Sequence, residues 1–173
     1  MPIAPIQGTA AVFGDHVSAD SMLPARHSFL PPDQMAEQVL MDVGPEANRK
    51  VRTHPVIVAG DAFGYGTGRE SPSRALRAAG VRAVIARSFS RLFFRNALNN
   101  GIVVIQCPAL AAMSVQDGDP VTIALEEGKV HWNGQSFDFP PMSGVVSEIV
   151  AAGDLISYGR ALLAKSASSG AGA

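Results

Sequence analysis

The middle third of the chain alternates short apolar runs with longer stretches in which apolar residues recur at helical spacing. Three runs rich in Val, Ile and Ala predict buried strands, at residues 55–60, 81–86 and 102–107. Between them, residues 71–80 and 88–101 carry apolar side chains three and four positions apart, which predicts amphipathic helices. Strands that alternate with helices over such short connections predict a parallel sheet with the helices packed on it.

The first of these helices has clear end signals in the sequence. Ser71 is predicted as its N-cap and Pro72 stands at the first helical position, where a missing N–H costs nothing. Gly80 supplies the stop at the other end. The helix is therefore expected to begin directly after a glycine-rich stretch, Gly-Tyr-Gly-Thr-Gly-Arg-Glu, which we call the glycine loop (residues 64–70).

The flanks of the chain follow a different pattern. Residues 9–17 and 121–139 are typical of β-structure, and the Glu-Glu-Gly sequence at 126–128 predicts the turn of a hairpin. Together with the middle third, these flanks predict an α/β fold. Its centre is a largely parallel sheet flanked by helices, and the hairpin lies at its periphery.

The C-terminal part of the chain predicts a closing helix and a short tail. Residues 143–165 have helical character with a break at Gly153. Residues 166–173 are Ser, Ala and Gly alone, which cannot bury a core, and predict a disordered tail. No repeat or linker divides the rest, so residues 1–165 are expected to form one compact domain.

Composition narrows the class of function. The 173 residues are 47% hydrophobic and 17% charged, which is typical of a globular protein. The net charge is −1 without a block of like charges, so we expect neither nucleic acid nor an anionic membrane as a partner. The N-terminus lacks a basic segment followed by an apolar one, and no apolar run reaches membrane-spanning length. These features predict a cytoplasmic protein.

The few cysteines and histidines make a metal centre in this chain alone unexpected. Cys107 is the single cysteine of the sequence, so it forms no internal disulfide and cannot by itself hold an iron–sulfur cluster. The four histidines lack the paired spacing of metal ligands; they are His16, His27, His54 and His131. We therefore predict that the chain itself binds no metal.

The glycine loop is the strongest candidate for chemistry. A strand, a glycine-rich loop and a helix N-terminus together make a site for an anion, because free backbone N–H groups and the helix dipole face the ligand. A dinucleotide fingerprint beginning at Gly64 would need its third glycine at position 69, which is Arg69. The next predicted strand ends in Arg87, where a dinucleotide-binding fold carries an acid, and no Walker sequence is present.

A carboxylate is the second candidate ligand of this loop. Arg69 offers a planar fork that matches a carboxylate with two hydrogen bonds, and Thr67 adds a hydroxyl. The sequence of the loop alone is explained equally well if its residues have structural roles and bind no ligand. In that structural explanation Thr67 makes a local turn bond, Arg69 is a solvated charge and Glu70 favours the helix N-terminus.

The loop and its surroundings resemble a known family. Residues 60–101 are similar to the swivelling domain of the aconitase superfamily, with the small subunits of 3-isopropylmalate dehydratases and their relatives as the nearest group. The likeness extends over about residues 5–165 and includes the sequences at 14–26 and 148–163. It implies a compact swivelling β/β/α domain, in agreement with the strands and helices predicted above.

The resemblance also implies a reaction, the reversible dehydration of a hydroxy-dicarboxylic acid. It implies that a large partner subunit holds a 4Fe–4S cluster, whose open iron binds the substrate hydroxyl as a Lewis acid. The family's base is the first serine of a serine pair, used as an alkoxide, and its position here is Thr67. The loop would have to stabilise that oxyanion, through backbone N–H groups, the helix N-terminus and Arg69.

Several positions depart from the family pattern. Thr67 keeps the hydroxyl of the first serine, whereas Gly68 replaces the second. Ser71 stands where histidine is common, and Ser-Ala-Asp at 18–20 keeps one of two usual aspartates. The catalytic residues expected from the resemblance are Thr67 and Arg69. These departures weaken the assignment of one particular acid as substrate.

The remaining candidates concern substrate binding. In the family, the stretch that corresponds to residues 25–32 is associated with telling an isopropyl group from a carboxylate, and residues 26–29 are the candidates within it. Asp20 is expected to orient an active-site arginine across the subunit interface, with a cap or turn role as the alternative. Arg91, Arg95 and Asn96 are expected at the surface or an interface. The predicted substrate-binding residues are Gly66, Gly68, Arg69, Asp20, Arg26, His27, Ser28 and Phe29.

The sequence thus predicts the small subunit of a hydro-lyase acting on 2- and 3-isopropylmalate in leucine biosynthesis. One alternative is the small subunit of a sister enzyme for homoaconitate or a methyl-substituted malate. The other, from a different class, is a carboxylate-binding regulatory module that has lost catalysis, because the serine pair is altered.

Overall fold

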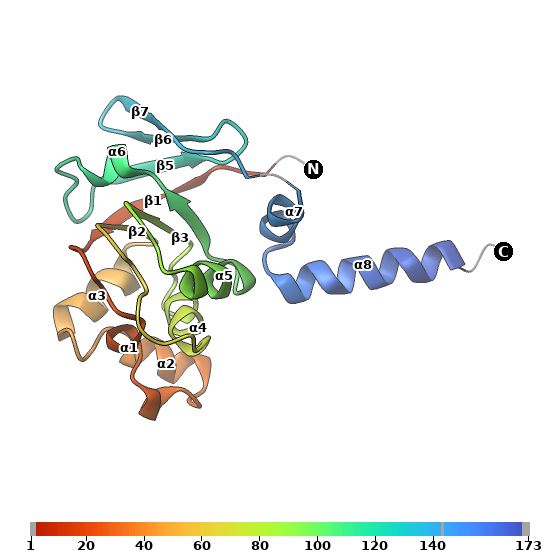
Figure 1. The fold of residues 1–173 in the computed structure, drawn as a ribbon, viewed down its shortest axis with the longest axis horizontal. Coiled ribbons are helices and arrows are strands. Elements are labelled where there is room, and N and C mark those ends of the chain that lie inside the picture. Colours follow the sequence, from red (N-terminus) through yellow and green to blue (C-terminus); the bar gives the residue numbers. More distant parts are fainter. Residues whose placement is uncertain (1–2, 143, 171–173) are drawn as a thin grey trace.

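The computed structural model describes residues 3–142 and 144–170, and its centre is one mixed sheet (Figure 1). Within those residues the sheet has seven strands in the order β4-β3-β2-β1-β5-β6-β7. Their bounds are β1 Ile6–Val12, β2 Val56–Ala59, β3 Ala83–Ala86, β4 Val103–Gln106, β5 Pro120–Ala124, β6 Lys129–Trp132 and β7 Gln135–Asp138. The first four strands pair in parallel and the last three are antiparallel. The predicted largely parallel centre is confirmed.

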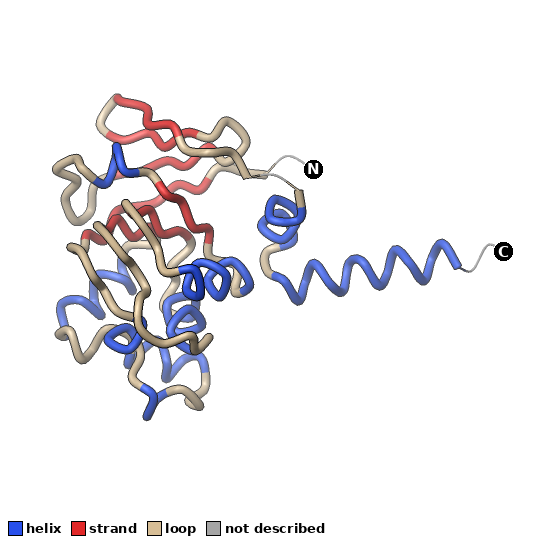
Figure 2. The backbone as a smooth tube through the Cα atoms, viewed as in Figure 1, coloured by secondary structure: helices blue, strands red, loops and turns tan. Residues whose placement is uncertain are grey.

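The helices that precede β4 lie on one side of the parallel strands, whereas the short helix at residues 108–111 lies on the other side, where Leu110 is buried. The bounds of the helices are α1 Ala19–Met22, α2 Pro32–Gln38, α3 Pro45–Thr53, α4 Ser71–Ala78, α5 Arg91–Asn99, α6 Pro108–Ala111, α7 Val145–Ala152 and α8 Leu155–Gly170, with a 3₁₀ turn at Ala25–His27. Each crossover moves one strand further in the same direction, and right-handed crossovers that do so place their helices on one face. Figures 1 and 2 show α1 to α5 on that face and β5 to β7 curling over the other.

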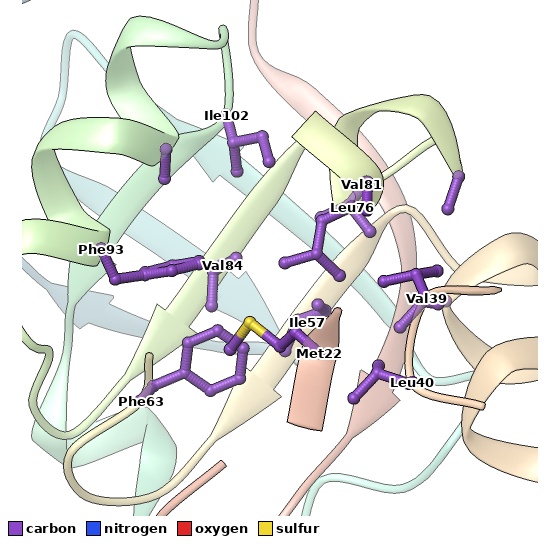
Figure 3. Packing of buried hydrophobic residues seen from close by; sticks show 14 of the residues in the cluster. Met22, Val39, Leu40, Ile57, Phe63, Leu76, Val81, Val84, Phe93 and Ile102 are labelled. Atoms are coloured by element: carbon purple, nitrogen blue, oxygen red, sulfur yellow. The ribbon is translucent and has the colours of Figure 1, made fainter. Parts of the chain in front are cut away.

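The helical face of the sheet is packed with apolar side chains. Figure 3 shows Ile57 and Val84 from the strands among Met22, Leu76 and Phe93 from the helices. The two strand residues, Met22 and Leu76 are fully buried and Phe93 nearly so. Helix α4 buries the apolar side that the sequence pattern predicts. In α5, Phe93 and Leu98 are buried as predicted, whereas Leu92, expected on the same side, is 51% exposed.

The opposite face of the sheet has its own core. Val58 and Ile85 point to this side, where Val121, Ile123 and Trp132 of the antiparallel strands cover them. Strands buried on both faces need apolar residues at every position, which is why the middle runs are continuously apolar. The layers are thus β, β and α, as the resemblance implies.

The predicted β-flanks differ from the structure in detail. Strand β1 ends at Val12, and residues 13–17 form a loop toward α1, although residues 9–17 were expected as β-structure. Residues 121–139 hold three strands in place of one hairpin, because a second turn lies at Asn133-Gly134. Both turn residues have positive φ, 48° and 74°, which an Asn-Gly pair tolerates in a tight hairpin turn.

The C-terminal region forms two helices with the predicted break. Gly153 has a φ of 97° and separates α7 from α8. Helix α8 projects from the rest of the molecule and runs to Gly170, past the predicted boundary at residue 165 (Figure 1). The last residues of the predicted tail, 171–173, lie outside the described residues. Among the helices described, none is both long and apolar enough to cross a membrane.

Candidate active site

The glycine loop connects the carboxyl end of β2 to α4, the edge at which open parallel sheets bind ligands. Buried Phe63 precedes the loop and stacks edge-on against Phe93 of α5, with ring centroids 5.2 Å apart. Two backbone hydrogen bonds tie the loop to the entry of α1: Gly64 N–H to the Val17 carbonyl at 2.8 Å, and Ala19 N–H to the Tyr65 carbonyl at 2.8 Å. The loop is thereby fixed beside α1.

Arg69 is the centre of the site. Its Nη2 donates to Asp20 Oδ1 at 2.6 Å, and its Nη1 donates to Ser28 Oγ at 2.6 Å and to the Leu23 carbonyl at 3.4 Å. The side chain is 27% exposed. The explanation of Arg69 as a solvated surface charge is therefore wrong. The structure brings Asp20 and Ser28, two of the predicted substrate-binding residues, into contact with Arg69.

The hydroxyl of Thr67 receives two donors from Arg69. The backbone N–H of Arg69 lies 3.3 Å from Thr67 Oγ1, and the guanidinium Nε lies 3.2 Å from it. The first contact is the local turn bond that the structural explanation expects. The second brings a positive charge to the same oxygen, an arrangement that favours negative charge on it.

Two glycines of the loop give neighbouring side chains room. Gly66 has a φ of 101°, and a Cβ there would lie 2.8 Å from Asp20 Oδ2. A Cβ on Gly68 would lie 2.9 Å from Cδ1 of Leu92, the end of a flexible side chain. The absence of a side chain at position 66 therefore lets the Asp20 carboxylate reach Arg69.

Asn96 of α5 and Asn100, the residue at the C-cap of that helix, hold the loop from its other side. Asn96 Nδ2 donates to the carbonyls of Gly68 and Arg69 at 3.1 and 3.2 Å. One turn later, Asn100 Nδ2 donates to Glu70 Oε1 at 2.8 Å. Asn96, expected at the surface or an interface, is half-buried and also supports the loop. The signal in the sequence was the pair of amides four residues apart, which share one helix face.

The start of α4 differs from the prediction. Ser71 is the first residue of the helix, and Glu70 occupies the N-cap position without a side-chain cap bond. The Ser71 hydroxyl lies 3.0 Å from Ser28 Oγ. Ser71 thus connects the helix to the Arg69 cluster through Ser28, and the prediction of Ser71 as the N-cap is wrong.

Comparison with known proteins places this geometry in a family. Residues 33–110 match the model of the aconitase C-terminal domain. The chain is 38% identical over 161 residues to the 3-isopropylmalate dehydratase small subunit of Nautilia profundicola, covering 91% of this chain and 96% of that one. It is 37% identical to the small subunit of the same name from Methanosarcina acetivorans, covering 92% and 99%. The chain belongs to the 3-isopropylmalate dehydratase small-subunit family.

A solved structure agrees with this membership. The crystal structure of a 3-isopropylmalate dehydratase from Methanocaldococcus jannaschii superposes with a TM-score of 0.82 at 33% identity. The superposition covers 94% of this chain and 99% of that one. The predicted resemblance to the aconitase superfamily, and with it the assignment to hydro-lyase subunits, is confirmed.

Residues 26–29, which were expected from the resemblance to contact the substrate, lie only partly in the site. Ser28 contacts Arg69, as described above. Arg26 turns away and pairs with Asp42, Nη2 to Oδ1 at 2.6 Å, with both side chains well exposed. Phe29 is 98% exposed, and His27 is half-buried on the 3₁₀ turn. The structure therefore does not bring Arg26 or Phe29 to Arg69.

The described part of the chain offers few groups that could hold a metal. No group of three His, Cys, Asp or Glu side chains in residues 3–142 and 144–170 is placed to hold a metal ion. The Cys107 thiol is buried, 3.7 Å from the Asp138 carbonyl. These residues do not fit an iron–sulfur cluster, which requires several thiolates.

Proposed function

We propose that this chain is the small subunit of a hydro-lyase that interconverts 2- and 3-isopropylmalate in leucine biosynthesis, in the cytoplasm. The observation that carries the proposal is the Thr67 hydroxyl, which receives two hydrogen bonds from Arg69 in a chain of the dehydratase small-subunit family. The enzyme is complete when a large subunit that holds the 4Fe–4S cluster docks against the glycine loop. We assign the cluster to that partner, because the sequence has a single cysteine and the described residues hold no group of three donors placed for a metal.

Thr67 acts as the base in this proposal. The substrate proton sits on a carbon beside a carboxylate, and a neutral hydroxyl is too weak to remove it. The N–H and Nε–H of Arg69 stabilise the alkoxide form of Thr67 and so lower the cost of forming the base. The extra methyl of threonine restricts χ1, which holds Oγ1 in one direction.

Arg69 binds a substrate carboxylate by exchange with Asp20. In the present structure the Asp20 carboxylate occupies Nη2, and its side chain is 58% exposed. A substrate carboxylate has the same charge and shape, and a partly exposed ion pair contributes only about 0–1 kcal/mol. Asp20 therefore keeps the guanidinium oriented until substrate arrives and then yields its position.

Residues 26–29 favour an alkyl substituent over an extra carboxylate. Arg26 already has a carboxylate partner in Asp42, so its charge is satisfied within the chain. A third substrate carboxylate would need another buried cation, which costs free energy when absent. Phe29 offers an apolar ring that is 98% exposed in this structure. These two side chains support an isopropyl-bearing acid over homoaconitate.

The proposal is tested by assembly. The chain is co-purified with a large subunit under anaerobic conditions, and turnover is measured on a panel of alkyl- and carboxylate-substituted malates. We expect activity only in the complex, with isopropylmalate as the best substrate. An iron-loaded complex without turnover on any acid would favour the regulatory module. Activity of the isolated chain, or one equivalent of iron bound to it, would refute the proposal that the large subunit holds the cluster and this chain supplies the base.

A further inference from the structure

Helix α8 exposes a row of large apolar side chains. It leaves the body of the molecule after α7, and Figure 1 shows its C-terminal half clear of the other elements. Leu155, Ile156, Leu162 and Leu163 are 40%, 66%, 46% and 71% exposed. A helix of this length is marginal alone in water, so a partner surface would also stabilise it.

The row is symmetric about one glycine. Leu155 and Ile156 lie four and three residues before Gly159, and Leu162 and Leu163 lie three and four after it. At about 100° per residue, all four side chains fall within about 60° of the direction of Gly159. No atom lies within 4 Å of the position that a Cβ on Gly159 would take. The centre of the row is thus open to close approach by a backbone.

A pattern with this symmetry is complementary to itself. When a second α8 lies antiparallel with its Gly159 at the crossing point, Ile156 of one helix faces Leu162 of the other. In the same way Leu155 faces Leu163, and each contact occurs twice, as in an isologous two-fold interface. We propose that α8 is a dimerisation helix, which pairs antiparallel with α8 of a second copy of this chain and crosses it at Gly159.

The chemistry and the area of the row agree with a second copy as the occupant. The row itself carries no charged side chain, so two copies meet without like-charge repulsion, and Asp154 and Lys165 lie about 140° and 120° from the direction of Gly159, away from the partner helix. Arg160 lies at the edge of the row, about 100° from Gly159, where solvent screens it. Two 16-residue helices, each ~24 Å long, bury on the order of 1,000 Å² in total, at the lower end of stable interfaces. The dimer is therefore expected to depend on concentration.

Cysteine cross-linking of the full chain tests the crossing point. Gly159→Cys places two thiols on the two-fold axis, within the Cα separation of about 7 Å that a disulfide allows. Ala161→Cys, on the opposite side of the helix, is the matched control, and native Cys107 is buried. We expect mild oxidation to give a disulfide dimer with Gly159→Cys and a monomer with Ala161→Cys.

Sedimentation over a range of concentrations provides the second measurement. We expect a monomer–dimer equilibrium that Ile156→Glu abolishes and Ile156→Leu retains, with unchanged helix content in both. A wild-type chain that stays monomeric at every concentration would overturn the proposal, as would equal cross-linking at 159 and 161. Protection of the Gly159→Cys thiol by the large subunit, without small-subunit dimers, would assign the row to that subunit instead. These outcomes leave the proposed reaction untouched, because α8 carries none of its residues.

Discussion

The glycine loop and residues 26–29 both belong to the candidate site, yet the fold holds them very differently. The loop is tied to the entry of α1 by backbone bonds, to α5 by Asn96 and to its own Arg69 through Thr67. In residues 26–29 only Ser28 is bonded to the loop, while Phe29 lies in solvent. A base must be positioned before substrate arrives, whereas a selecting side chain can be ordered by substrate and partner. Under the proposed function, the contrast separates a rigid part that supplies the base from an adaptable part that selects the substrate.

Removing the hydroxyl of Thr67 is the strongest test of the rigid part. Thr67→Ala in the assembled enzyme is expected to lower kcat by about 10²- to 10⁴-fold, the range typical of a lost proton-transfer group. Thr67→Ser keeps the hydroxyl and is expected to retain most of the activity. Steady-state kinetics of the two variants gives the comparison. Near-normal turnover of Thr67→Ala would reduce the loop to a structural turn.

The adaptable part is tested by the ratio of kcat/KM for alkyl- and carboxylate-bearing malates. Phe29→Ala is expected to change this ratio by about 10- to 200-fold, the range of a changed apolar contact. Arg26→Ala serves as the control, because Arg26 is already paired with Asp42 and should leave the ratio unchanged. If Phe29→Ala slows every acid equally, selection resides elsewhere, most simply in the large subunit.

Arg69 connects the two parts, so its replacement should affect binding. Arg69→Lys keeps the charge but loses the fork that contacts Thr67, Ser28 and Asp20 at once. We expect KM to rise by about 10- to 100-fold, the equivalent of one lost charged hydrogen bond. A normal KM with a low kcat would show that Arg69 serves the base and leaves the substrate carboxylate to another group.

The support from α5 should give the smallest effect. Asn96→Ala leaves the carbonyls of Gly68 and Arg69 without their donor and is expected to cost about 1–3 kcal/mol of unfolding free energy. It should also lower kcat more than it raises KM, because the loop loses its position. Asn99→Ala, on the same helix but without a side-chain bond to the loop, is the control in denaturant titrations and kinetics. Equal effects of the two variants would deny Asn96 a positioning role.

The same contrast explains how much of the site the sequence predicts. Thr67 and Arg69 are two residues apart, so their contact follows from local geometry and is visible in the sequence. Asp20 lies 49 residues from Arg69, and Ser28 lies 41 residues from it. The contacts of these two residues with Arg69 depend on how α1 packs against the loop. The sequence therefore predicted Asp20 and Ser28 as site residues but not that they contact Arg69.

Fold-level predictions show a similar division. The alternation of strands and helices in the middle third was predictable, because its short, continuously apolar runs are typical of strands buried on both faces of a sheet. The antiparallel end was harder, because the Asn133-Gly134 turn lies inside a stretch that also fits one long strand. Ser71 has the residue type of an N-cap, but its hydroxyl bonds to Ser28 instead. The preference of a residue type for a position such as the N-cap predicts its role only where no residue distant in the sequence bonds to the same side chain.

The most direct test of the site is a structure of the assembled enzyme with the unsaturated acid that forms when water is lost. The proposal predicts that Thr67 Oγ1 lies about 3–3.5 Å from the carbon that carried the proton. It also predicts that a carboxylate of the ligand occupies the Nη2 side of Arg69, with Asp20 displaced. A ligand held out of reach of Thr67, with the Arg69–Asp20 pair intact, would contradict both roles.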